Sequence, residues 1–120
     1  MKKKSKNQVP RKRNEFRYHM VEYINSLGVK TKMAHPSFIF LEKGNLFMYV
    51  SLTHSKEIGN IPLIKLSKNP NNKDKSDSYL VLEFKEDTKD RFGSRRKGWK
   101  MDSNDEQFIR NIYQNWNKKR

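Results

Sequence analysis

The sequence predicts a mainly β protein of the α+β class: a small, strongly curved antiparallel sheet or partly open barrel, with one helix before it and one after it. Short β-branched and aromatic runs recur along the middle of the chain, separated by polar loops of unequal length. Helical spacing of apolar residues occurs only towards the two ends, which disfavours a parallel βαβ layout. A chain of 120 residues has room for one core.

The charge distribution divides the chain into a tail and a body. Residues 1–13 carry seven Lys or Arg and no acid, so we expect a disordered basic tail. Residues 14–120 hold the apolar clusters and are expected to form a single compact domain. No run approaches the roughly 18 apolar residues of a membrane span, and none behind the tail resembles a signal-peptide core. We therefore expect a cytoplasmic protein that does not contact membranes.

The first element of the body is predicted to be an amphipathic helix over residues 15–27. Asn14 is a suitable N-cap, and Gly28 is placed to end the helix in a left-handed conformation. Apolar residues recur at helical spacing along this segment. They are Phe16, Met20, Val21, Ile24 and Leu27.

The middle of the chain predicts the strands. Residues 37–42 and 46–52 flank a Lys-Gly-Asn turn and are expected to form a hairpin, and residues 61–67 form a short third strand. Residues 68–78 contain no apolar side chain and many turn formers, which indicates a long exposed loop. Residues 78–84 are the most continuous β-branched and aromatic run and are expected to form a central strand.

A basic segment and a second helix complete the predicted domain. The segment 85–100 is expected to contain one helical turn before Gly93 and then a basic loop. Asp102 or Ser103 then caps the terminal helix, Ser103 with Glu106 matching the spacing of a capping box. One face of this helix is apolar. It consists of Phe108, Ile109, Ile112, Tyr113 and Trp116.

The net charge of +14 makes nucleic acid the expected partner, because so basic a surface attracts polyanions. The absence of cysteine excludes disulfides, thiolate metal sites and cysteine nucleophiles. No paired-histidine metal motif, phosphate-binding loop, dinucleotide fingerprint or hydrolase elbow is present. We therefore expect neither a metal nor a cofactor.

A polar cluster at the open ends of the predicted hairpin is the candidate catalytic site. His35 precedes the first strand, and Thr53, His54 and Ser55 follow the second, so the hairpin makes them neighbours. Two imidazoles beside a hydroxyl can supply the acid and the base for metal-free RNA cleavage through the 2′-hydroxyl. The alternative is structural: His35 packs beside Pro36, and His54 hydrogen-bonds the loop.

Cations and a tryptophan form the candidate nucleic-acid interface. Basic residues can bind phosphates while an exposed ring stacks on a base, as in single-strand recognition. The alternative for the aromatic residues Phe92 and Trp99 is that they fold inward to the core. The predicted contacts are Lys12, Arg13, Lys73, Lys75, Arg91, Arg95, Arg96, Lys97, Trp99 and Lys100.

Four segments in order resemble the PemK/MazF family of toxin endoribonucleases. "HPSFIF" is similar to the family's opening Arg-Pro and apolar strand, and "LFMYVSLTHS" to the strand that ends in an active-site Thr or Ser. "IPLIKL" is similar to the strand after the substrate loop, and "DSYLVLEFKEDTKDRF" to the strand that leads into a short helical segment. The resemblance spans about residues 35–116.

The resemblance implies an SH3-like barrel, metal-independent cleavage of single-stranded RNA, frequent homodimerisation and neutralisation by an antitoxin. The family's catalytic threonine falls on Thr53 and its arginine on His35. This second position is a departure, because arginine stays cationic whereas histidine exchanges a proton near neutral pH.

Two other classes of function stay open at this point. One is a non-catalytic basic protein of phage, plasmid or chromosomal origin that binds nucleic acid, whose affinity would fall steeply with salt. The other is a small inhibitor that binds a nucleoprotein.

Overall fold

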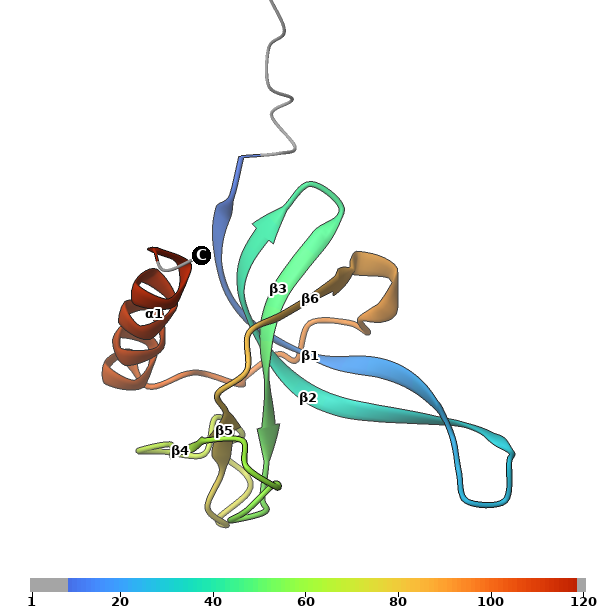
Figure 1. Cartoon of the computed structure of the whole chain (residues 1–120). Helices are drawn as coiled ribbons and strands as arrows, with labels where there is room; N and C mark the ends of the chain where they lie inside the picture. The colour runs from blue at the N-terminus through green and yellow to red at the C-terminus, as the bar shows by residue number, and fades with distance from the viewer. Residues whose placement is uncertain (1–8, 119–120) are drawn as a thin grey trace, which may run out of the picture.

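The computed structural model describes residues 9–118, and within them six strands form one antiparallel sheet that does not close into a barrel (Figure 1). The strand order is β1-β2-β3-β5-β4, and β6 also pairs with β3. The mainly β prediction is therefore confirmed. The elements are β1 (Arg11–Ile24), β2 (Lys30–Lys43), β3 (Leu46–Thr53), β4 (Leu63–Lys65), β5 (Tyr79–Val81), β6 (Lys85–Thr88), the 3₁₀ turn η2 (Lys89–Arg91) and helix α1 (Ser103–Lys118).

The predicted helix over residues 15–27 is wrong, because this segment lies in β1 and in the turn that follows it. β1 pairs with β2 from Arg11↔Glu42 to Ile24↔Lys30. Phe16 is 1% exposed and packs against Phe38 on β2, with the ring centroids 5.1 Å apart. Most of the other apolar residues of the expected helical face are exposed, so a helix would have had no core to face. Pairing with β2 thus overrides the helical spacing.

Residues 11–13, which the sequence assigned to the tail, belong to β1, whereas residues 1–8 lie outside the described residues.

The β1–β2 hairpin extends beyond the sheet as a two-stranded arm (Figure 1). Pairing between β2 and β3 stops at Ser37↔Ser51, while β1 and β2 continue to Ile24↔Lys30. The turn contains Gly28 at φ 78°, so the predicted left-handed glycine is confirmed in a hairpin turn rather than at a helix end. Six exposed large apolar residues lie along the arm: Met20, Tyr23, Ile24, Leu27, Val29 and Met33.

The predicted hairpin of residues 37–42 and 46–52 is confirmed as the inner part of β2 with β3. The predicted strand 78–84 is shorter and interior: β5 lies between β3 and β4 and pairs with the end of β3. The chain then bends, and β6 pairs with the beginning of β3. η2 supplies the helical turn expected before Gly93.

Helix α1 is confirmed and is capped by Asp102, whose Oδ2 accepts from the N–H groups of Asn104 and Asp105 at 3.1 and 3.4 Å. Ile109 is fully buried and joins the main core. Phe108 is 51% exposed, so the predicted apolar face of this helix is only partly buried. That core also contains Phe16, Phe38, Phe40, Val50, Leu52, Leu66, Leu80 and Met101.

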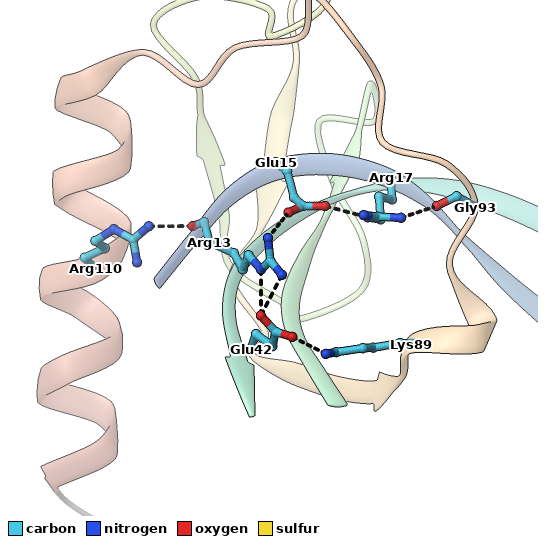
Figure 2. Close-up of polar contacts among 7 residues, drawn as sticks. All are labelled: Arg13, Glu15, Arg17, Glu42, Lys89, Gly93 and Arg110. Atoms are coloured by element: carbon cyan, nitrogen blue, oxygen red, sulfur yellow. Dashed lines mark hydrogen bonds and ion pairs between the residues drawn. The ribbon is translucent and has the colours of Figure 1, made fainter. Parts of the chain in front are cut away.

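An ion-pair network ties β1, β2, η2 and the segment after η2 together (Figure 2). Arg13 binds both Glu15 and Glu42, and Glu42 also binds Lys89. Glu15 in turn binds Arg17, whose guanidinium donates to the Gly93 carbonyl at 2.9 Å. Arg110 joins α1 to this assembly by donating to the backbone carbonyls of Arg13 and Phe40.

Candidate functional site

A pocket of about 350 Å³ opens where β2 and β3 cease to pair. His35, Thr53 and His54 all line it, as the hairpin geometry predicted. Ser55 does not line it, although its backbone N–H donates to Thr53 Oγ1 at 3.1 Å. The other lining residues are Tyr18, Pro36, Leu52, Asn69, Asn71, Asp74, Ser78 and Trp99.

His54 is held by the loop and at the same time lines the pocket. Its Nδ1 lies 2.9 Å from the Asp77 carbonyl oxygen, which can only accept, so Nδ1 carries a proton. Its Nε2 lies 3.4 Å from Asp74 Oδ2, and its side chain is 62% exposed. The hydrogen bond to the loop, which the sequence analysis gave as the structural alternative for His54, is therefore present, and the residue also lines the pocket.

Asp74 is the carboxylate of the pocket, and sequence reasoning missed it. The Ser76 hydroxyl and the Ser76 N–H donate to Asp74 Oδ1 at 2.6 and 2.9 Å, and with the nearby His54 they hold the pKa of Asp74 below its usual range. Asp74 is thus a carboxylate at neutral pH beside an imidazole. The loop is folded by Asx turns, in which Asn69 and Asn71 accept from the N–H two residues ahead.

His35 is an exposed residue of β2 and is not buried in the core. Its backbone lies opposite His19 on β1. Within residues 9–118 its ring forms no hydrogen bond, so both ring nitrogens are available to a ligand. Continuing the register beyond Ser37↔Ser51 by two residues aligns His35 with Thr53, on the same face of the hairpin.

The third histidine, His19, is a core residue. It is 6% exposed, and its Nε2 lies 2.8 Å from Asp87 Oδ2. Its ring packs against Tyr49 and Phe92, with centroids 4.6 and 4.7 Å away. Burial opposes ionisation of Asp87, but the bonds from His19 and the Thr88 N–H outweigh it and lower the pKa of Asp87. The His19 ring is therefore enclosed by the fold.

Trp99 and Arg96 stand beside the pocket. Trp99 is half-buried, packs against Phe16 and Tyr18, and also lines the pocket. The guanidinium carbon of Arg96 lies 5.0 Å from the Tyr18 ring centroid and 5.6 Å from that of Trp99. Phe92 is 8% exposed, as the inward-folded alternative expected. Trp99 combines packing with access to the pocket.

The other predicted nucleic-acid contacts are dispersed. Arg13 is bound by Glu15 and Glu42, and Arg91 lies 3.5 Å from Asp87, so carboxylates already neutralise both. Lys12, Lys75 and Arg95 are exposed on separate segments and line neither the pocket nor two hollows that adjoin it. Lys73, Lys97 and Lys100 lie in hollows that adjoin the pocket.

The part of the chain that the structure describes contains no group of three metal-ligating side chains, and none of its helices could cross a membrane. No family model, no curated protein and no solved structure matches the chain.

Proposed function

We propose that the protein is a PemK/MazF-like, metal-independent endoribonuclease that cleaves single-stranded RNA, and that its curved sheet is an SH3-like variant. One observation carries the proposal: His35 on β2, Thr53 at the end of β3 and His54 directly after it line a single pocket. These are the groups that cleavage through the 2′-hydroxyl requires. The Asp77 carbonyl orients His54 through Nδ1 and leaves Nε2, 3.4 Å from the Asp74 carboxylate, to exchange the proton.

In the proposed reaction the RNA supplies the nucleophile. The 2′-oxygen attacks the adjacent phosphorus while its proton passes to one imidazole, and the bond from phosphorus to the 5′-oxygen breaks. The other imidazole gives its proton to that leaving oxygen, which yields a 2′,3′-cyclic phosphate and a 5′-hydroxyl. The Thr53 hydroxyl donates to a non-bridging phosphate oxygen as charge develops there. His35 thus exchanges a proton where the resembling family has a fixed cation.

The test incubates the purified protein with a mixed RNA pool in EDTA and analyses the new ends. We expect 2′,3′-cyclic phosphates, with rates reduced about 10²–10⁴-fold by His35→Ala or His54→Ala. Thr53→Val, which keeps the shape of the side chain, should cost about 10²-fold. Thr31→Val on the arm and Ser55→Ala outside the pocket are the controls and should change little. If no cyclic ends form, the proposal fails.

A second function, non-catalytic binding of nucleic acid, is favoured by the exposed cations beside the pocket. Lys73 and Lys97 form no ion pair within residues 9–118, so they are free to bind phosphates. This function predicts binding that weakens steeply with salt and is retained in His35→Ala. Binding without cleavage would select it.

A further inference from the structure

Two further hollows adjoin the pocket. The second, of about 460 Å³, shares Asn71 and Trp99 with the pocket. The third, of about 530 Å³, shares Asn72 and Gly98 with the second. Residues 68–74 and 96–103 supply most of both, and the Lys100 N–H joins the two segments by donating to the Pro70 carbonyl at 3.0 Å. The second and third hollows together are called here the loop groove. Each hollow has the size of a small-ligand site, about 300–1,000 Å³.

The cations of the loop groove are not neutralised by the protein. Lys73, Arg96 and Lys97 line the second hollow, and Lys68 and Lys100 line the third. None of the five forms an ion pair with a carboxylate of residues 9–118. Elsewhere in the fold, by contrast, cations such as Arg13, Arg17, Lys89 and Arg110 are paired.

The acids of the third hollow are already occupied. Asp102 caps α1, and Glu106 accepts from Asn14 at 2.7 Å and from Arg110 at 2.9 Å. Their charges are thus partly balanced within the fold, whereas the charges of the lysines across the hollow are not. The excess in the loop groove is therefore positive.

An aromatic ring lies at the junction between the first two hollows. Trp99 lines both, and Phe16 and Tyr18 support it from the protein side. The Arg96 guanidinium that covers part of this ring keeps donors for a phosphate, because the rings hold it without consuming its N–H groups. A supported ring between free cations is the arrangement that binds an unpaired base and its phosphates.

We propose that the loop groove binds a single nucleic-acid strand of about four nucleotides, with one base at Trp99 and the phosphates at Lys73 and Lys97 and then at Lys68 and Lys100. The strand leaves the His54 pocket through this groove. The inference takes its ligand class from the proposed function but does not depend on cleavage.

Trp99 can report on the groove directly. In Trp116→Phe protein it is the remaining tryptophan of the chain, because the sequence contains two. This protein is titrated with 2′-O-methyl oligouridylates of two to eight nucleotides, which cannot be cleaved through the blocked 2′-oxygen. We expect quenching of Trp99 emission, and an affinity that rises up to about four nucleotides and then levels off.

Paired lysine substitutions locate the phosphate contacts. Lys73→Gln combined with Lys97→Gln should weaken binding about tenfold at low salt. It should also reduce the slope of log affinity against log salt concentration by about 1.4, because two phosphate contacts are lost. The matched control is Lys30→Gln with Lys32→Gln, which removes the same charge from two exposed lysines on the arm. The control should lower the affinity for the oligonucleotide by less than about twofold.

Any of three results would overturn the inference: the two double lysine variants lose the same affinity, Trp99 emission does not change on binding, or a duplex binds as tightly as the single strand. Cleavage of RNA with unchanged Trp99 emission would support the proposed function but contradict strand binding in the loop groove. Binding in the groove without cleavage would support strand binding but contradict the proposed endoribonuclease function.

Discussion

Replacing Glu42 by Gln should destabilise the protein in a pH-dependent way, because this carboxylate is shared by two cations. Its side chain is 12% exposed, Arg13 Nη2 lies 2.7 Å away, and Lys89 binds the other oxygen. The cations are 40% and 31% exposed, which places the cost between that of a surface pair and that of a buried one. We expect a loss of about 1–2 kcal/mol at pH 7, or about 4–8 °C in Tm.

The direction in which the pKa of Glu42 is shifted determines at which pH its stabilisation is lost. The hydrogen bond from Lys89 and the bond and charge of Arg13 outweigh burial and lower the pKa of Glu42 from its ordinary 4.5. The unfolded chain therefore takes up this proton first, so the stabilisation is present above about pH 4.5 and is lost as pH falls through the lowered folded value.

Urea unfolding of wild type and Glu42→Gln from pH 7 to pH 3 measures this difference in free energy of unfolding, which should narrow below about pH 4.5. The matched control is Glu83→Gln, since Glu83 pairs with Lys85 on the surface and both side chains are nearly half exposed. It should cost less than about 1 kcal/mol. A Glu42→Gln deficit that stays constant from pH 7 to pH 3 would refute the reasoning.

Three other substitutions test burial and backbone conformation. Burial, together with the nearby carboxylates, raises the pKa of Tyr49 to about 12, so stability should fall as pH rises from 10 towards 12, and Tyr49→Phe should flatten that slope in unfolding experiments. Ile109→Ala should cost about 2–4 kcal/mol in urea unfolding, against less than about 1 kcal/mol for the exposed Phe108→Ala. Gly28→Ala should lower Tm through a cost of about 1–2 kcal/mol at φ 78°. Gly93→Ala should cost less, because Gly93 is outside the left-handed region and an added Cβ would lie 3.8 Å from the Tyr18 carbonyl oxygen, an ordinary contact distance.

The parts of the fold that the sequence predicts correctly are those fixed by local signals. Gly44 in the turn and the apolar runs on either side specify the β2–β3 hairpin, and Asp102 before an apolar helical face specifies α1. β1 could not be predicted in this way. Its partner, Lys30–Lys43, reaches much further back than the apolar run at residues 37–42, through Lys30 and Lys32, which carry no strand signal.

The same distinction applies to the site. Hairpin pairing alone brings His35 towards Thr53 and His54, so their common pocket was predictable. Asp74 was not, because its position depends on side-chain hydrogen bonds within a polar loop, and turn-forming residues indicate that a loop bends without indicating where it ends.

The strand character of β1 also determines where the basic segment lies. The edge of β1 that faces away from β2 forms hydrogen bonds with the chain after η2. The Gly93 N–H donates to the Tyr18 carbonyl at 2.9 Å, and the Arg96 N–H donates to the Phe16 carbonyl at 2.7 Å. The Arg17 side chain adds a hydrogen bond, because its guanidinium donates to the Gly93 carbonyl oxygen. A helix in place of β1 would use these carbonyls internally and leave the segment without an edge to bind. The β1 edge therefore holds residues 96–100 against the His54 pocket, and with them one wall of the loop groove.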